Sequence, residues 1–142
     1  YITVGRYQAH LRRICRVYRS RRDTMLAALE RCMPPGTAYQ TPQGGLFIWL
    51  RLPAGLSAIE LAPLAGEEGV AFAPGPLFSP GGHAQSYLRL NFVMHPPEVI
   101  EDGILRLGRA VERLLARREQ KEKEEKEEYD AASAVRRQAV VV

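Results

Sequence analysis

The chain has 142 residues, 46% of them hydrophobic and 25% charged, and a formal net charge of +4. This length suits one folded domain and excludes a second domain of full size. The excess positive charge lies in residues 6–31, which hold eight arginines, so the chain is not basic throughout. We find neither an apolar run long enough to span a bilayer nor a signal peptide, and we expect a cytoplasmic protein without membrane contact. Because the first residue is not methionine, we also expect a piece of a longer protein.

The cysteines and histidines predict no metal site. Cys15 and Cys32 fall on one predicted helix, where the helical rise separates them by roughly 25 Å, too far for a disulfide. His10, His83 and His95 have no spacing typical of metal ligands. No metal-binding residue is therefore assigned.

Residues 7–33 predict a long amphipathic helix. Apolar side chains recur at steps of three, four or seven and form one stripe, at Tyr7, Leu11, Ile14, Tyr18, Met25, Leu29 and Cys32. The run Pro34-Pro35-Gly36 then ends the helix, because consecutive prolines cannot continue its hydrogen bonds.

Two short strands and a helix are expected next. Residues 37–40 and 46–52 favour strands, and the turn formers at 41–45 between them predict a hairpin. Ser57 is placed to cap a helix that runs to about residue 68, with Glu60 three residues later completing a capping box. Pro63 either argues against this helix or kinks it.

The second half of the chain predicts a strand at 70–73, a Pro- and Gly-rich loop at 74–82, a strand at 87–92 and a final helix from Pro96. The buried side of this helix is expected to hold Val99, Ile100, Ile104, Leu107, Val111, Leu114 and Leu115. Beyond residue 115 the apolar stripe stops and Glu–Lys pairs four residues apart replace it. We therefore predict a folded domain over residues 1–115 and a charged tail over 116–142, helical at first and then disordered.

The strand at 87–92 carries the most informative residue. Strict alternation places Leu88, Leu90 and Phe92 on one face of the strand and Arg89 on the other. A guanidinium that points away from the core can present a planar fork to a carboxylate.

Several runs in this order resemble one protein family. They are residues 42–49 (PQGGLFIW), 69–75 (GVAFAPG), the pair Leu77-Phe78 and residues 88–92 (LRLNF). Together they are similar to fold-type I, class I/II aminotransferases, which use pyridoxal phosphate, and within them to aminoadipate and kynurenine aminotransferase-like enzymes and the aminotransferase-like domains of some transcription regulators. The resemblance covers about residues 4–115 and corresponds to the carboxy-terminal small domain. It implies an α/β chain of the α+β kind, with a small three- to four-stranded sheet packed against helices and long helices at both ends.

What the resemblance implies for function centres on Arg89. In this family the arginine of the matching strand holds the α-carboxylate of the amino-acid or 2-oxo-acid substrate. The family reaction also needs a lysine that forms a Schiff base with pyridoxal phosphate. The lysines of this chain, Lys121, Lys123 and Lys126, lie among glutamates in a charged, exposed stretch and are not expected to be catalytic. We therefore assign no catalytic and no cofactor-binding residue here, and expect this segment alone not to transaminate.

The resemblance also implies partners for the whole protein: a large domain that is missing from this segment and a second copy in a homodimer. It leaves the amino acid or 2-oxo acid open, because Arg89 reads only the carboxylate that all of them share. Gly44-Gly45 fits a hairpin turn or a close approach to the substrate. Phe78 is expected to anchor the 74–78 loop and could wall the substrate cavity, and no chemistry is assigned to Phe47 or Trp49.

Two other functions are considered. The protein could be a transcription regulator in which an aminotransferase-like domain senses a cofactor or an amine, and nothing in these residues separates it from an enzyme. Alternatively, Arg12, Arg16 and Arg19 share one helix face that could bind nucleic acid. A solvent-facing basic helix between domains explains the same arginines, so nucleic-acid binding is the less favoured interpretation.

Overall fold

The computed structural model describes residues 2–42, 44–53, 55–78 and 81–139. The helices are α1 (Ile2–Cys32), α2 (Ala58–Glu67) and α3 (Pro97–Gln138), with one short 3₁₀ helix, η1 (Gly75–Leu77). The strands are β1 (Ala38–Tyr39), β2 (Phe47–Arg51), β3 (Ala73–Pro74) and β4 (Tyr87–Asn91). Across these described residues the fold is α+β with a four-stranded sheet, as predicted.

The sheet is antiparallel and has the strand order β1-β2-β4-β3. In this register Arg89 lies opposite Trp49 of β2 on one side and Ala73 of β3 on the other. Side chains that alternate along the two central strands form the core face of the sheet, at Ile48, Leu50, Leu88 and Leu90, each at most 6% exposed. The opposite face of β4 is therefore the face of Arg89.

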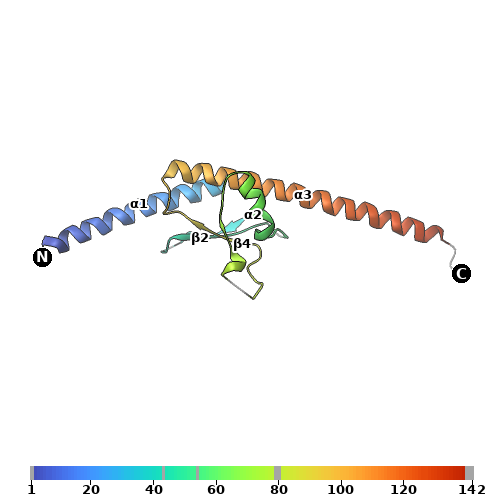
Figure 1. Cartoon of the computed structure of the whole chain (residues 1–142), viewed down its shortest axis with the longest axis horizontal. Coiled ribbons are helices and arrows are strands. Elements are labelled where there is room, and N and C mark those ends of the chain that lie inside the picture. Colours follow the sequence, from blue (N-terminus) through green and yellow to red (C-terminus); the bar gives the residue numbers. More distant parts are fainter. Residues whose placement is uncertain (1, 43, 54, 79–80, 140–142) are drawn as a thin grey trace.

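The helices cover the core face of the sheet, and the segment around η1 projects beyond the sheet on the side away from α1 and α3 (Figure 1). The second half of α1 runs beside the first part of α3 in the same direction. Arg21 donates a hydrogen bond to the Val93 carbonyl near the start of this contact, and the Cys32 backbone meets Gly108 near its end. The core between these layers is wholly apolar among the described residues.

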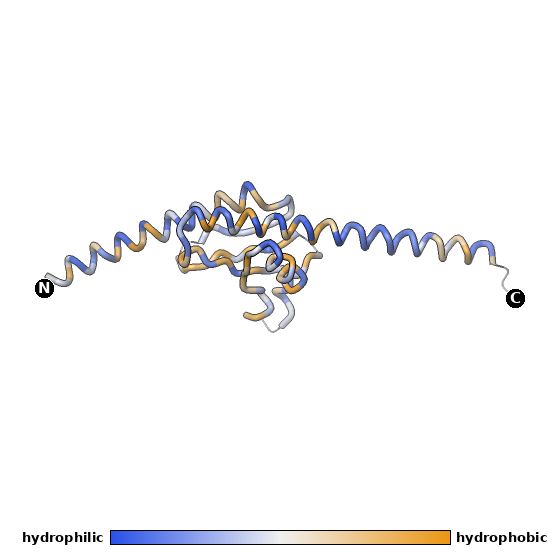
Figure 2. The backbone as a smooth tube through the Cα atoms, turned by 45° about the horizontal axis from the view of Figure 1, so that its top comes forward, coloured by the Kyte–Doolittle hydropathy of each residue, from blue (hydrophilic) through white to orange (hydrophobic). Residues whose placement is uncertain are grey.

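Both long helices extend further than the apolar stripes predict. Helix α1 begins at Ile2 rather than near residue 7, and its first half is exposed. Helix α3 continues to Gln138, well past the last core residue, and this extension is strongly hydrophilic (Figure 2). Residues 140–142, at the end of the tail that was expected to be disordered, lie outside the described residues. Val99, predicted to be buried in α3, is 46% exposed, although the next residue, Ile100, is 4% exposed, because Val99 lies at the edge of the apolar stripe.

Two predictions for residues 70–82 are wrong. The predicted strand 70–73 is reduced to Ala73–Pro74, because this edge strand pairs with β4 only at Arg89 and Leu88. The segment predicted to be only loop, 74–82, contains Pro74 of that strand and the η1 turn. Residues 79–80 of this segment are not described.

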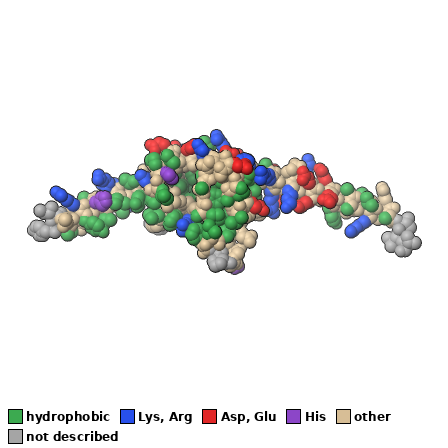
Figure 3. All heavy atoms as spheres, viewed as in Figure 1, with side chains coloured by type: hydrophobic (Ala, Val, Ile, Leu, Met, Phe, Trp, Pro, Cys, Tyr) green, Lys and Arg blue, Asp and Glu red, His purple; other side chains and the backbone are tan. Residues whose placement is uncertain are grey.

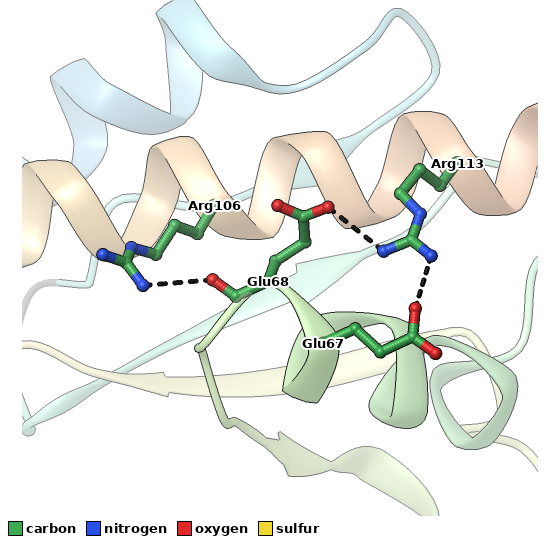
Figure 4. A network of polar contacts seen from close by, with 4 residues as sticks. All are labelled: Glu67, Glu68, Arg106 and Arg113. Carbon is green, nitrogen blue, oxygen red and sulfur yellow. Dashed lines mark hydrogen bonds and ion pairs between the residues drawn. The ribbon is translucent and has the colours of Figure 1, made fainter.

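The C-terminal end of α2 is tied to α3 by charged groups (Figure 4). Arg113 forms ion pairs with Glu67 and Glu68, and Arg106 donates to the Glu68 backbone carbonyl at 3.1 Å. The hydrogen bond to Glu67, together with the smaller effect of Glu68, raises the pKa of Arg113. At the other end of α2 the Ser57 hydroxyl accepts from the Glu60 N–H at 3.5 Å, as the capping pattern predicts, and Pro63 lies inside the helix.

Candidate functional site

Arg89 lies at the centre of β4, with its side chain on the face of the sheet that the helices leave open. Its neighbours along the strand, Leu88 and Leu90, point into the core, and Arg89 itself is half-buried. Alternation places Asn91 on the same face, where its side-chain oxygen accepts the Val93 N–H at 2.8 Å. The strand-face prediction for Arg89 is thus confirmed as geometry.

The Arg89 guanidinium lies between two aromatic rings. Its Cζ atom is 4.0 Å from the centre of the Phe47 ring and 3.9 Å from the centre of the Phe78 ring. Both distances are well inside the range in which a cation is attracted by a ring face. Phe47 comes from the neighbouring strand, one diagonal position away, since its direct partner across β2 and β4 is Asn91.

Phe78 reaches Arg89 through a tight turn. The η1 turn follows β3 directly, and the Phe78 N–H closes it by donating to the Gly75 carbonyl at 2.9 Å. Gly75 packs so closely that an added Cβ would lie 2.6 Å from the Ala84 carbonyl oxygen and 2.7 Å from that of Tyr87. A larger residue at position 75 would therefore displace the segment that carries Phe78.

The charge of Arg89 has no acidic partner within the described part of the chain. No ion pair or hydrogen bond joins the guanidinium to another described residue. Its Nε atom is buried and has no acceptor in the described ranges. Buried donors are nearly always paired in native proteins, so an unpaired arginine of this kind suggests an acceptor supplied from outside.

A cavity of about 740 Å³ borders Arg89. It lies where residues 69–73, the end of β4 and the first turns of α3 meet, and Phe47, Phe72, Arg89, Asn91, Met94 and Val99 are among the residues that line it. Hydrophobic side chains also gather on the central part of the molecule in the view of Figure 3, while charged side chains are frequent on α3 just beyond it. The arginine is thus placed at a concave, largely apolar surface.

The remaining residues considered for the site are the hairpin glycines and the aromatic residues of β2. Gly45 has a φ of +81° and open space around it, as a hairpin turn requires, and residue 43 of this turn lies outside the described residues. Trp49 is 45% exposed on the open face and meets Phe78 edge-on. Phe47, to which the sequence assigned no role, contacts Arg89 directly. Alternation along β2 and β4 could have indicated this contact, whereas nothing in the sequence fixes the approach of Phe78.

The lysines lie far along the extension of α3. Lys121 is 76% exposed and faces Glu125 at 3.9 Å. Among the described residues there is no group of three or more metal-binding side chains. None of the described helices is long and apolar enough to span a membrane.

The sequence and the fold of this chain are both similar to those of known aminotransferases. The chain is 44% identical over 110 residues to 2-aminoadipate transaminase of Thermus thermophilus, an alignment that covers 78% of the chain and 28% of the relative. It superposes with a TM-score of 0.74 and 44% identity on the crystal structure of alpha-aminoadipate aminotransferase from Thermus thermophilus complexed with N-(5'-phosphopyridoxyl)-L-leucine, again over 78% of the chain and 28% of that structure. The chain is homologous to the C-terminal domain of fold-type I aminotransferases.

Relatives of this chain also include regulators. An uncharacterized HTH-type transcriptional regulator of Escherichia coli is 33% identical over 115 residues, which are 81% of the chain and 25% of the regulator. No family model matches the sequence. The chain therefore spans roughly a quarter of the length of the relatives that it matches.

Proposed function

We propose that this aminotransferase domain binds the α-carboxylate of an amino acid or 2-oxo acid through Arg89, as part of a pyridoxal-phosphate-dependent aminotransferase. One observation carries the proposal: a guanidinium that pairs with no acidic group among the described residues lies on the open face of the sheet and beside a cavity. An arginine whose charge is already neutralised by an aspartate or glutamate would not be available in this way.

The chemistry of the proposed contact follows from the shape of the two groups. A guanidinium presents parallel N–H donors that match the two oxygens of a carboxylate. Two hydrogen bonds fix the plane of the carboxylate as well as its position, and a lysine amine would fix only the position. A substrate held in this manner has its Cα at a defined place for a reaction that other parts of an enzyme perform.

The residues of this chain do not fit the cofactor. A Schiff base with pyridoxal phosphate needs a lysine near the substrate, whereas Lys121, Lys123 and Lys126 lie on the exposed extension of α3, which points away from the sheet (Figure 1). We assign to this chain the carboxylate contact alone and propose that it is inactive by itself. The cofactor, the catalytic lysine and a large domain are assigned to other parts of the whole protein.

The proposal is tested by NMR titration of this chain with pyruvate. Signals of the Arg89 side chain and of its neighbours on β4 are expected to shift with pyruvate and not with methyl pyruvate, which lacks the charged carboxylate. Arg89→Lys is expected to weaken pyruvate binding about tenfold, the effect of losing one charge-assisted hydrogen bond.

Arg51→Lys is the matched control. Arg51 lies on the same face of the sheet, is exposed, and pairs across the strands with Tyr87. Its substitution leaves the charge unchanged and is expected not to alter the titration. Equal losses in the two variants, or shifts that do not involve Arg89, would refute the proposed role.

A regulator is the second candidate, favoured by the similarity to the Escherichia coli protein. The gene that encodes these residues separates the two possibilities. A lysine for the cofactor in the encoded large domain would favour an aminotransferase. An encoded DNA-binding segment would favour an HTH-type regulator. Homodimerisation and a cytoplasmic location, both expected from the sequence, stay predictions.

A further inference from the structure

We propose that Phe47 and Phe78 are positioning residues that fix the plane of the Arg89 guanidinium. This inference rests on the proposed carboxylate-binding function, because it states how the arginine is prepared for that ligand. The two rings form what we call the aromatic clamp, defined by Phe47 and Phe78 on either side of Arg89.

The geometry of the clamp covers the guanidinium without neutralising it. The ring centres lie 4.0 Å and 3.9 Å from Cζ, so both rings are in van der Waals contact with the cation. Aromatic rings stabilise a cation through their electron-rich faces but accept no strong hydrogen bonds. The rings thus leave the N–H donors of Arg89 unpaired while they restrict rotation of the group.

The two rings are anchored by different means. Phe47 is held by β2, whose residues Ile48 and Leu50 are fully buried on the opposite face. Phe78 is held by the η1 turn and by Trp49, whose ring meets it edge-on with centroids 6.1 Å apart and planes at 90°. Trp49 lies directly opposite Arg89 in the sheet. The residue that supports Phe78 is therefore on β2, the same strand that carries Phe47.

Such a clamp lowers the entropic cost of binding. A free arginine side chain loses conformational freedom when it orders around a ligand, which weakens affinity by about threefold to tenfold for one long side chain. A guanidinium that is already held flat avoids most of this loss. The effect is specific for planar, bidentate ligands, because a spherical anion such as chloride needs no defined plane.

The test uses Phe47→Leu and Phe78→Leu, which keep apolar bulk but remove the flat ring. Leu77→Ala is the control, since Leu77 precedes Phe78 in the same turn and is 71% exposed. Phe78→Tyr retains the ring and serves as the conservative rescue. The readouts are the NMR order parameter of the Arg89 Nε–H bond in the absence of ligand and the dissociation constants for pyruvate and for chloride.

We expect an order parameter typical of rigid groups in the original chain, in Leu77→Ala and in Phe78→Tyr, and a fall below about 0.6 in both leucine variants. Pyruvate affinity is expected to fall about threefold to tenfold in the leucine variants, with chloride affinity unchanged. An Arg89 that is equally rigid without either ring, or equal losses for pyruvate and chloride, overturns the inference.

The outcomes also separate this inference from the proposed function. If pyruvate does not bind the original chain but the order parameter still falls in the leucine variants, the clamp stands and the carboxylate role fails. If pyruvate binds through Arg89 and both readouts are unchanged in the leucine variants, the carboxylate role stands and the clamp fails. A variant that does not fold is recognised by loss of the dispersed amide spectrum, and the other leucine variant then decides.

Discussion

The contact between α1 and α3 offers a sharp test of the packing, because the two helices approach each other at a glycine. A Cβ atom added at Gly108 would lie 2.5 Å from the carbonyl oxygen of Cys32, 3.2 Å from its carbonyl carbon and 3.3 Å from its Cβ. The nearest atom belongs to the backbone of α1 and cannot rotate away. Gly108→Ala therefore requires the two helices to separate.

Gly103 is the matched control in the same helix. An added Cβ at Gly103 meets no atom within 4 Å. Alanine favours a helix over glycine by about 0.8–1.0 kcal/mol, so Gly103→Ala is expected to stabilise the fold by up to that amount. The same gain applies at Gly108, but overpacking there costs about 1–3 kcal/mol. The difference between the two variants isolates the steric term, about 1–3 kcal/mol in favour of Gly103→Ala.

The assay is urea unfolding followed by the fluorescence of Trp49, the only tryptophan of the chain. Fluorescence is preferred to circular dichroism because the solvent-exposed extension of α3 contributes helical signal unrelated to the core. A difference of 1 kcal/mol corresponds to roughly 4 °C in the thermal midpoint. If Gly108→Ala is as stable as Gly103→Ala, the close approach of the two helices is wrong.

Four further outcomes are expected. With pyridoxal phosphate this chain shows no imine absorbance, and a stable visible band abolished by borohydride would contradict that result. Ser57→Ala lowers the free energy of unfolding by about 0.5–1 kcal/mol through loss of the cap of α2, measured by urea unfolding. Arg113→Gln, which removes the ion pairs with Glu67 and Glu68, lowers the thermal midpoint, and about 1 M NaCl should shrink the difference. Burial raises the pKa of Tyr39, so its contribution to stability is complete below about pH 10 and is lost as pH rises further, and Tyr39→Phe should reduce this alkaline loss of stability.

Local patterns were sufficient for the elements that bury one regular stripe or face. The alternation around Arg89 predicted both the strand and the side of it on which the guanidinium lies. The sequence around Ser57 predicted the start of α2. The strand prediction holds because a period of two residues leaves only one face that can be buried, and the cap because a serine hydroxyl accepts an N–H of the first helical turn.

The residue pattern predicted the wrong strand length or burial where contacts with other elements decided them. The apolar run at 70–73 favours a strand, but only Ala73 and Pro74 find a partner on β4. Val99 belongs to the apolar stripe of α3 by type but lies at its edge, so it is 46% exposed beside the buried Ile100. The preference of a residue type for strands is a weak guide when few residues of a neighbouring strand are available to pair with it.

The order of apolar and polar residues thus determined on its own that this chain forms helices and short strands and that Arg89 lies on the side of its strand away from the core. Only the tertiary structure decided what lies beside that arginine. Phe47 arrives through strand register and Phe78 through a turn that closes on Gly75, two contacts made by residues distant in the sequence. Their geometry depends on how whole strands and turns pack, which side-chain periodicity along a single strand does not encode.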